Sequence, residues 1–445
     1  MRDLYDALSG IKSSAVSDEQ RVQVIQAVRD WLEKHQMEPV RLLQNKRILL
    51  GVSGGVACYK VVDLASKLTQ AGALIDCVLT ESAVKFVAPL LFAALTGRPA
   101  LTDADLWRSD LHVPHVGLGH ASDLIVIAPA TANTIAKLAH GLSDNLLTVS
   151  VLAATCPVII APAMDAGMWE HPATRANVDG LRAREVTIVG PAEGRMASGL
   201  TGAGRMVEPT ELLGWIRVVL GKQQALRGRK VLVTAGGTRE AIDPVRFVGN
   251  RSSGKQGFAL AQAAIDRGAD VTLIAGATAL DTPVGARRID VESAQQMRDA
   301  VLEACRDADA LLMAAAVADF RPEHATDHKI KKTKDTIELD LKLVRTLDIL
   351  QAVRQQRDTT HTPRVVVGFA AETHGLLENA QAKLESKGLD LIVANDVSVG
   401  DAGFGVDTNR VTLLDTHDGV EQLPVMSKAQ VAERVIDRVA ALLGN

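Results

Sequence analysis

Short apolar runs alternate with amphipathic stretches from residue 46 onward, and each run is long enough for one strand. The first run, residues 47–52, ends in the glycine turn Ser53–Gly55, and residues 57–71 then show helical spacing. Further strands are predicted at residues 74–79, 123–128, 158–161 and 186–189, and, in the second half, from residue 230 and at residues 270–275, 310–315, 364–368 and 389–394. Because strands that alternate with helices form parallel sheets, the pattern predicts an α/β protein with two doubly wound, mainly parallel-sheet domains.

The stretches before and between these two patterns differ from them. Ser17–Gln20 resembles a helix-capping box, and apolar residues follow it at helical spacing. We interpret residues 1–45 as an N-terminal helical extension that serves packing or oligomerisation rather than a site. Residues 221–229 are polar, flanked by glycine and without periodicity, which is typical of a linker. The predicted domains are residues 46–220 and 230–445.

Composition agrees with buried parallel sheets and excludes several classes of protein. Of the 445 residues, 47% are hydrophobic and 23% charged, which excludes a disordered chain. Aromatic residues make up only 3%, so the core must be aliphatic, and stacking platforms for single-stranded nucleic acid are not expected. The formal net charge of −4 gives no electrostatic footprint for DNA or RNA. We expect no nucleic-acid partner.

Cysteine usage and hydropathy favour a cytoplasmic location. The chain has four cysteines, none in CxxC spacing and all within apolar stretches: Cys58, Cys77, Cys156 and Cys305. Buried free thiols in a reducing compartment explain them best. Residues 1–10 carry acidic groups where a signal peptide would be apolar. Residues 146–164 lack charge, but Pro157 and Pro162 interrupt them, so a helix followed by a buried strand is expected rather than a membrane span.

Small and hydroxyl-bearing residues follow several predicted strands of the first domain. Gly51–Ala57 joins a strand to a helix, where glycines let the backbone approach a phosphate. The turn matches neither GxGxxG nor a Walker A motif, so phosphate binding and a plain tight turn stay equal alternatives. Thr80, directly after another strand, would add a hydroxyl to the same pocket. Thr131 and Asn133 offer hydrogen bonds among small residues that leave space for a flat ring.

Two more loops, residues 161–169 and 194–206, make the order of motifs specific. Together the loops resemble those of the flavin-dependent cysteine decarboxylases, specifically the phosphopantothenoylcysteine decarboxylase half of bifunctional coenzyme A biosynthesis proteins. The resemblance implies oxidation of a cysteinyl thiol to a thioaldehyde, loss of CO2 to an enethiolate, and reduction. It places His115 at the catalytic histidine, and an imidazole is suited to moving a proton near neutral pH. It implies that FMN is held by Ser53, Gly54, Thr80, Thr131 and Asn133.

Two positions depart from that family pattern. Asp165 stands where the substrate loop usually has asparagine, and Ser198 stands where the usual proton-donating acid is a cysteine. A thiol has a pKa of about 8.5 and a hydroxyl one near water's 15.7, a difference of roughly 10 kcal/mol in proton-donating ability. Ser198 therefore cannot simply replace the cysteine, although it could relay a proton from water. A carboxylate at Asp165 would also repel the substrate carboxylate unless it is protonated or paired with a cation. Because both changes concern one reaction, they could compensate as a set.

The second domain carries its own polar loops at strand ends. Residues 234–246 follow the first strand of this domain, and residues 252–257 combine glycines, hydroxyls and Lys255 at the start of a helix. The P-loop spacing is absent, but an anionic ligand is still favoured there. Asp319 at a strand end and the lysine run 329–332 could organise Mg²⁺ and a triphosphate, although a lysine run is usually a solvated loop.

The second domain resembles the phosphopantothenate–cysteine ligase half of the same bifunctional family. The resemblance implies activation of 4′-phosphopantothenate by CTP to an acyl-cytidylate, which the amine of cysteine attacks. It implies that Asn250 stabilises this step as an amide donor and that Asp319 binds Mg²⁺. The preference for CTP over ATP rests on the resemblance alone. The implied nucleotide site comprises Met313, Ala314, Ala315, Asp319, Lys329, Thr346, Leu347, Asp348, Ile349, Phe369, Lys383 and Lys387.

These observations lead to one hypothesis and leave two alternatives. The hypothesis is a bifunctional enzyme of coenzyme A biosynthesis that ligates and then decarboxylates. One alternative is an active ligase fused to a regulatory FMN-binding domain with impaired decarboxylation, which Asp165 and Ser198 favour. A nicotinamide dehydrogenase is less favoured because its glycine fingerprint is missing. The resemblance also implies a homo-oligomer, with trimeric flavin domains and dimeric ligase domains.

Overall fold

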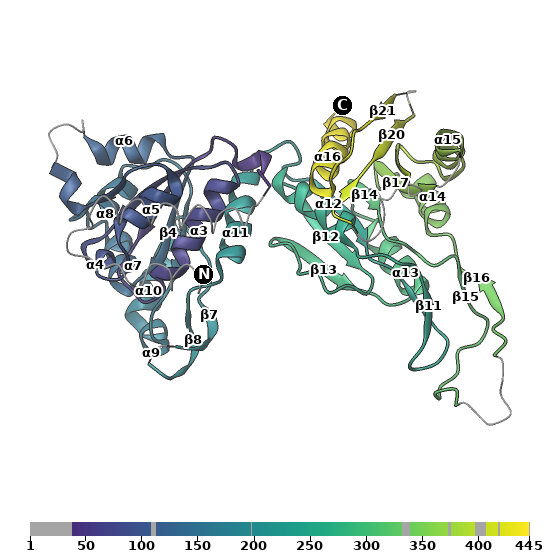
Figure 1. Ribbon diagram of the computed structural model, residues 1–445, viewed down its shortest axis with the longest axis horizontal. Coiled ribbons are helices and arrows are strands. Elements are labelled where there is room, and N and C mark those ends of the chain that lie inside the picture. Colours follow the sequence, from purple (N-terminus) through teal and green to yellow (C-terminus); the bar gives the residue numbers. More distant parts are fainter. Residues whose placement is uncertain are drawn as a thin grey trace, which may run out of the picture. The chain divides into compact units, whose positions relative to one another are not determined.

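The structure is a computed structural model that describes residues 38–445 except 108–112, 197, 332–338, 373–374, 397–405, 417–418 and 445. The chain divides into two compact units, the first ending at Leu220 and the second beginning at Gly221 (Figure 1). Most of the predicted N-terminal extension lies outside the described residues. Each unit has helices on both faces of a central sheet, so the prediction of two doubly wound α/β domains is confirmed.

The first unit contains a parallel sheet of six strands in the order β3-β2-β1-β4-β5-β6. The order reverses between β1 and β4, which makes this the topological switch point, where ligands of such sheets bind. The strands are β1 (Arg47–Val52), β2 (Leu74–Leu79), β3 (Ala100–Thr102), β4 (Leu124–Ala130), β5 (Val158–Pro162) and β6 (Thr187–Ile188). A separate antiparallel hairpin pairs β7 (Ala192–Arg195) with β8 (Thr201–Arg205).

Helices cover both faces of this sheet. They are η1 (Arg41–Leu43), α3 (Cys58–Gln70), α4 (Glu81–Val84), α5 (Pro89–Thr96), η2 (Asp103–Trp107), α6 (Pro114–Ala121), α7 (Ala132–His140), α8 (Leu146–Leu152), α9 (Ala166–Glu170), α10 (Pro172–Arg182) and α11 (Pro209–Gly221). Ile48 and Leu50 pack into one core cluster and Leu49 into the other, as alternation along a strand requires. Phe92 and Trp169 are the buried aromatics among the described residues of this unit, so its core is aliphatic.

The second unit contains a mixed sheet in the order β13-β12-β9-β14-β17-β18-β20-β21. Its parallel strands are β9 (Lys230–Ala235), β12 (Asp270–Ala275), β13 (Ala286–Asp290), β14 (Ala310–Met313), β17 (Val365–Glu372) and β18 (Leu391–Asp396). The sequence pattern missed the antiparallel edge strands β20 (Val411–Asp415) and β21 (Val420–Gln422). Three two-stranded ribbons pair β10 (Arg239–Ala241) with β11 (Phe247–Gly249), β15 (Phe320–Pro322) with β16 (Leu343–Arg345), and β19 (Thr408–Asn409) with β22 (Met426–Ser427).

Two groups of helices lie on opposite faces of the second sheet (Figure 1). Helices α12 (Lys255–Asp266) and α16 (Lys428–Gly444) pack together on one face. Helices α13 (Ala294–Ala304), α14 (Ile349–Thr360) and α15 (Leu376–Lys387) form the other group. Within the described part of the chain, no helix is both long and apolar enough to span a membrane. The uncharged residues 146–164 form α8 and then β5, as predicted.

Candidate functional site

The predicted flavin-site residues lie at the carboxyl ends of three adjacent strands in the first unit. Ser53 follows β1, Thr80 follows β2, and Thr131 follows β4. Across the switch point, the buried hydroxyl of Ser53 donates to the carbonyl of Pro129 at 2.7 Å and accepts from the amide of Thr131 at 3.0 Å. Tertiary structure thus brings together residues that the sequence separates by 78 positions.

Two of these residues also cap helices. The Thr80 hydroxyl accepts from the amide of Ala83 at 3.3 Å, and the Thr131 hydroxyl accepts from the amide of Thr134 at 3.3 Å. A hydroxyl that accepts in this way keeps its own O–H to donate, so capping does not prevent ligand binding. Asn133 lies in the first turn of α7 and is exposed.

The backbone at Gly54 packs closely against the next loop. A Cβ atom added at Gly54 would lie 2.4 Å from the Cβ of Ser82, so this approach requires glycine. Helix α3 begins four residues later, at Cys58, with no side-chain cap at its first turn. The amides of Cys58 and Lys60 donate to the carbonyls of Gly55 and Ala57, and no side chain accepts from this first turn, whose helix dipole favours an anion.

His115 is the second residue of α6 and is partly buried. Its Nδ1 atom is fully buried and has no hydrogen-bond partner among the described residues. Buried polar atoms rarely stay unpaired, so this nitrogen is available to a ligand or to a group outside the described part of the chain. No hydrogen bond between described residues joins His115 to Asp165 or Ser198 within one copy.

Asp165 and Ser198, the two positions that depart from the family pattern, form a direct pair. The Ser198 hydroxyl donates to Oδ2 of Asp165 at 2.7 Å, while Oδ1 accepts from the amide of Gly167 at 3.0 Å. The hydrogen bond from Ser198, followed by that from Gly167, holds the pKa of Asp165 below its usual range. Among the described residues, no ion pair neutralises this carboxylate. It is therefore ionised at neutral pH and anchors the β7–β8 connection to the start of α9.

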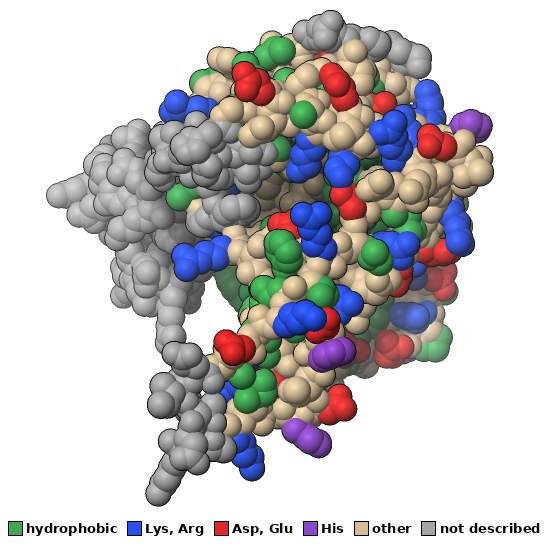
Figure 2. Space-filling model, turned by 90° about the vertical axis from the view of Figure 1, so that its right-hand side faces the viewer, with side chains coloured by type: hydrophobic (Ala, Val, Ile, Leu, Met, Phe, Trp, Pro, Cys, Tyr) green, Lys and Arg blue, Asp and Glu red, His purple; other side chains and the backbone are tan. Residues whose placement is uncertain are grey.

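The second unit contains a cavity of about 920 Å³ at the carboxyl ends of its parallel strands. It extends from the face of α14 and α15, over the strand ends, to the face of α12 and α16. In Figure 2, lysine and arginine side chains gather around a hollow in this unit. The predicted residues that line the cavity are Asn250, Met313, Ala314, Ala315, Asp319, Thr346, Leu347, Asp348, Ile349, Phe369, Lys383 and Lys387.

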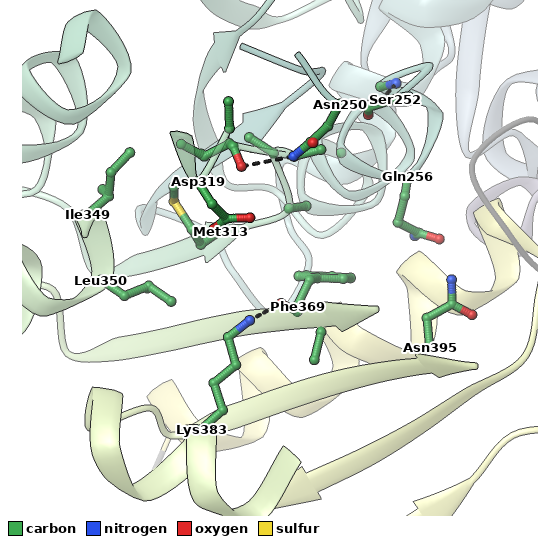
Figure 3. Close-up of a pocket in the computed structure, with 18 of the residues that line it drawn as sticks. Asn250, Ser252, Gln256, Met313, Asp319, Ile349, Leu350, Phe369, Lys383 and Asn395 are labelled. Carbon is green, nitrogen blue, oxygen red and sulfur yellow. Dashed lines mark hydrogen bonds between the residues drawn. The ribbon is translucent and has the colours of Figure 1, made fainter. Parts of the chain in front are cut away.

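Polar contacts hold the α14–α15 side of the cavity in place. Lys383 donates to the carbonyl of Phe369 at 3.0 Å, and the Thr346 hydroxyl donates to the carbonyl of Ala318 at 2.7 Å (Figure 3 shows the former). Lys387 pairs with Asp348. Burial raises the pKa of Asp348, but hydrogen bonds from Lys387 and the Gln351 amide outweigh it, and the pKa falls below its usual value. Asp348 is therefore ionised at neutral pH and keeps Lys387 beside the cavity.

Asn250 and Asp319 lie near one another over the strand ends (Figure 3). Asn250 donates one N–H to the carbonyl of Val317 at 2.9 Å. A carboxamide has two N–H donors, so the second remains for a substrate. Asp319 is exposed and lines the cavity, as a carboxylate that shares a cation with bound phosphates would. Within the described residues, no group of three or more His, Cys, Asp or Glu side chains could hold a metal ion alone.

Lys329 is the predicted nucleotide-site residue that the structure does not bring to this cavity. Its neighbour Ile330 is held elsewhere, because the Ile330 amide donates to Asp243 at 3.2 Å and Arg246 donates to the Ile330 carbonyl at 3.3 Å. The sequence shows a lysine run here but gives no sign of this anchoring.

Several residues that also line the cavity were missed from the sequence, among them Gln256, Asn409 and Lys428. Gln256 lies in the loop–helix segment that indicated an anion site, but Asn409 and Lys428 come from a short ribbon and the start of α16. They are separated from Gln256 by 153 and 172 positions, and their local sequence has no recognisable motif. Only the packing of α16 against α12 brings them into the cavity.

Comparisons with known proteins cover both units. The flavoprotein family matches residues 36–221, and the DNA/pantothenate metabolism flavoprotein C-terminal domain family matches residues 226–443. The coenzyme A biosynthesis bifunctional protein CoaBC of Bacillus subtilis is 45% identical over 404 residues, which cover 90% of this chain and 98% of that protein. The protein of the same name from Mycobacterium tuberculosis H37Rv is 48% identical over 415 residues, which cover 90% of this chain and 97% of that protein. A crystal structure of a CoaBC C-terminal domain matches at 38% identity and a TM-score of 0.43, covering 50% of this chain and 99% of that domain.

Proposed function

The chain belongs to the family of coenzyme A biosynthesis bifunctional proteins, and from this premise we propose that it performs two successive reactions. The second unit joins cysteine to 4′-phosphopantothenate at the expense of CTP, through an acyl-cytidylate. The first unit, with FMN, decarboxylates the resulting 4′-phosphopantothenoylcysteine to 4′-phosphopantetheine. Residues 46–220 and 230–445 are the two catalytic domains of this proposal.

The observation that carries the proposal is the cavity of the second unit. Eleven of the twelve residues assigned to the nucleotide by resemblance line one space of about 920 Å³. That volume suits a small-molecule site, which typically measures about 300–1,000 Å³. Lysines at both ends of the cavity favour phosphorylated reactants. The role of Lys329 stays a prediction.

The side chains over the strand ends suit acyl transfer. The free N–H of Asn250 would donate to charge that develops on the carboxyl of 4′-phosphopantothenate as the cytidylate forms and is attacked. Asp319 would share Mg²⁺ with the phosphates of CTP, since Mg²⁺ usually binds one or two carboxylates together with substrate phosphates. Lys383 and Lys387 would face the nucleotide from α15.

The residues at the switch point of the first unit fit FMN. The approach at Gly54, the uncapped start of α3 and the O–H groups of Thr80 and Thr131 would form a cradle for a phosphate and a flat ring. Ser53, whose own O–H donates to the carbonyl of Pro129, would hold the Thr131 amide in place beside it. Asn133, exposed beside Thr131, would add an amide. FMN, when bound, would supply the two-electron oxidation and reduction that accompany the loss of CO2.

The protein's own residues would handle the proton and the substrate. His115 would exchange a proton through a ring whose buried Nδ1 still needs a partner. Ser198 directs its proton to ionised Asp165, so the pair would orient the substrate loop and relay a proton from water rather than act as a strong acid.

We further propose a cytoplasmic homo-oligomer, with trimeric flavin domains and dimeric ligase domains. The alternative, an active ligase fused to a regulatory FMN-binding domain, is not favoured. The curated relatives described above are bifunctional along nearly their whole length, and this chain covers 97–98% of them.

Two separate assays test the proposal. Purified protein with FMN should release CO2 from 4′-phosphopantothenoylcysteine. With Mg²⁺, CTP, cysteine and 4′-phosphopantothenate it should form that compound. EDTA should abolish ligation and leave decarboxylation unchanged. Failure to release CO2 would overturn the decarboxylase half, and ligation that persists in EDTA would overturn the Mg²⁺ assignment.

A further inference from the structure

A chain of hydrogen bonds on the α12–α16 side of the ligase cavity fixes the orientation of Asn409. The side-chain amide of Gln256 donates to the backbone carbonyl of Lys428 at 3.2 Å. Since a carbonyl can only accept, the NH2 group of Gln256 must point toward Lys428 and its oxygen must point the other way. That oxygen accepts from Nδ2 of Asn409 at 3.2 Å. The amide oxygen of Asn409 is therefore directed away from Gln256.

This amide oxygen has no partner. Asn409 is 5% exposed and lines the cavity, and its Oδ1 is fully buried with no hydrogen-bond donor among the described residues. Oδ1 of Asn395, at the end of β18, is buried and unpartnered in the same way. Gln256 and Asn395 point toward one another in Figure 3. Asn409, whose amide oxygen is oriented, and Asn395 both line the cavity, so a ligand that brings O–H or N–H donors would satisfy their unpartnered oxygens.

Positive charge lies beside these acceptors. Lys255 at the first turn of α12 and Lys428 at the first turn of α16 both line the cavity, and Lys428 is 7% exposed. Burial and the nearby charge of Lys255 lower the pKa of Lys428, and an anion bound between the two lysines would relieve their repulsion. Helix α12 begins at Lys255 without a side-chain cap, and its first three residues line the same cavity.

We propose that the α12–α16 end of the cavity binds a phosphorylated reactant through one of its hydroxyl groups, which donates to the amide oxygen of Asn409, while Lys255 and Lys428 face its negative charge. The inference rests on the proposed ligase function and deepens it by naming a specificity-determining residue. Two reactants of that reaction have this chemistry: the nucleotide, through its ribose, and 4′-phosphopantothenate, through its own hydroxyl.

The carboxylate of Asp407 competes with a bound phosphate for Lys255. This carboxylate pairs with Lys255 at 2.6 Å, and the side chain of Asp407 is 83% exposed. An exposed ion pair of this kind is weak, so a phosphate with its higher charge can replace the carboxylate on Lys255. Removing the charge of Asp407 should therefore strengthen binding of the phosphorylated reactant, whereas removing a group that only stabilises the fold would not.

Deoxy analogues test the hydroxyl contact directly. Ligation by the full-length protein is measured with CTP, 2′-deoxy-CTP, 3′-deoxy-CTP, 4′-phosphopantothenate and its analogue without the hydroxyl. The wild type should lose about 10- to 100-fold in kcat/KM with the one analogue that leaves Oδ1 of Asn409 unpaired. In Asn409→Ala the kcat/KM values for the natural reactant and for that analogue should differ by no more than about 3-fold. The analogue that shows the effect identifies the reactant.

Matched variants keep the test independent of folding. Asn379→Ala makes the same substitution at an exposed residue of α15 outside the cavity and should keep the wild-type discrimination. Asp407→Asn should lower the KM of the identified reactant about two- to five-fold. Calorimetric unfolding of each preparation, in which the transition of the second unit is followed, shows that the mutated unit is folded.

The inference is overturned if the wild type accepts every deoxy analogue as well as the natural reactant, or if Asn409→Ala keeps the discrimination. A protein that ligates none of the natural reactants would instead overturn the proposed function. Equilibrium binding of the identified reactant and its deoxy analogue, measured calorimetrically, should show the same difference without turnover.

Discussion

Asp165 and Ser198 are 33 positions apart in the sequence and share one hydrogen bond of 2.7 Å. Taken separately, Asp165 adds a charge that would repel the substrate carboxylate, and Ser198 lacks the acidity of the usual cysteine. Taken together, they form an ionised carboxylate with an oriented donor. The hydroxyl satisfies the carboxylate and lowers its pKa, so neither residue is left unpaired. This contact supports the idea that the two departures from the family pattern compensate for one another.

A double-mutant cycle tests this coupling. Ser198→Cys alone would place a thiol beside an ionised carboxylate, which raises the thiol pKa and weakens it as an acid. Asp165→Asn removes that charge, so the double variant should form 4′-phosphopantetheine faster than the product of the single effects predicts. Contacting residues typically couple by roughly 2- to 150-fold in rate terms. Independent, multiplicative effects in a single-turnover assay would contradict the pairing.

The cysteines were expected to be buried free thiols, and for three of the four the structure supports this. Cys58, Cys77 and Cys305 are buried, whereas Cys156 is only partly buried, and burial raises the pKa of Cys305 to about 12. A thiol held protonated in this way is a packing group rather than a nucleophile.

Trp169 also has a packing role. Although it belongs to the substrate loop by sequence, it is buried in the core with Arg175 over its ring.

At the scale of elements, contacts between neighbouring segments hold the loops that contain the predicted site residues. Gly204 in β8 lies against the segment that leads to Asp165. A Cβ atom added there would lie 2.3 Å from the carbonyl oxygen of Met164 and 2.6 Å from the sulfur of Met196. The hairpin and the start of α9 can therefore approach one another only while this position lacks a side chain.

Gly204→Ala should separate Asp165 from Ser198. Because a misplacement of about 1 Å can reduce a rate by about 100-fold, we expect decarboxylation to fall by roughly that factor while ligation stays unchanged. Gly180→Ala is the matched control, since a Cβ atom in that helix would meet nothing within 4 Å. Both rates are measured on the same preparations. Equal decarboxylation rates in the two variants would show that the close approach at Gly204 is not needed for decarboxylation.

Asp243 anchors the segment that carries Lys329. Its carboxylate accepts from the amides of Val245, Arg246 and Ile330 at 2.7–3.2 Å and pairs with the Arg246 side chain at 3.1 Å. Burial raises its pKa, but these hydrogen bonds and the Arg246 charge outweigh burial and bring the pKa below its usual range. Because the folded pKa is lowered, the stabilisation is present above the unfolded value of about 3.8 and is lost as pH falls.

Asp243→Asn should therefore destabilise the second unit at pH 7, and its difference from the wild type should shrink as pH falls to about 3. Calorimetric unfolding at both pH values measures this, and hydrogen exchange at Ile330 should become faster in the variant. Asp290→Asn is a suitable control, because that carboxylate is exposed and pairs only with Arg288 among the described residues. A difference that is equal at pH 7 and pH 3 would exclude the carboxylate as its source.

At the scale of the whole molecule, the two predicted sites lie at corresponding places in their units. In each unit the predicted residues lie at the carboxyl ends of parallel strands around the switch point, β1/β4 in the first and β9/β14 in the second. The cavity of the second unit is lined by residues of that unit, and the predicted flavin-site residues all belong to the first unit. The two reactions should therefore be separable by mutation.

Complementation tests this separation. Asn250→Ala should reduce ligation about 10²- to 10³-fold, and His115→Asn should reduce decarboxylation about 10²- to 10⁴-fold, each without affecting the other reaction. A mixture of the two variants should then form 4′-phosphopantetheine from CTP, cysteine and 4′-phosphopantothenate, because the intermediate can diffuse between molecules. Wild-type protein at the same total concentration is the reference. No product from the mixture, with both half-reactions intact, would show that the intermediate does not exchange.

Much of this architecture was predictable from the sequence, because strand and helix periodicity are local properties. The alternating pattern predicted most parallel strands of both sheets, but it missed the parallel edge strands β3 and β13 and the antiparallel strands β20 and β21. Loop motifs predicted the residues around the strand ends, since carboxyl ends of parallel strands necessarily meet at one edge.

The sequence by itself determined the aliphatic core, the two α/β domains and the motifs that line their strand ends. Only the tertiary structure decided which distant polar groups face one another. The Asp165–Ser198 pair, the anchoring of Ile330 by Asp243, and the oriented oxygen of Asn409 all join residues at least 33 positions apart. Hydrogen bonds and ion pairs depend on distances of a few ångströms, and periodicity along the chain carries no information about them.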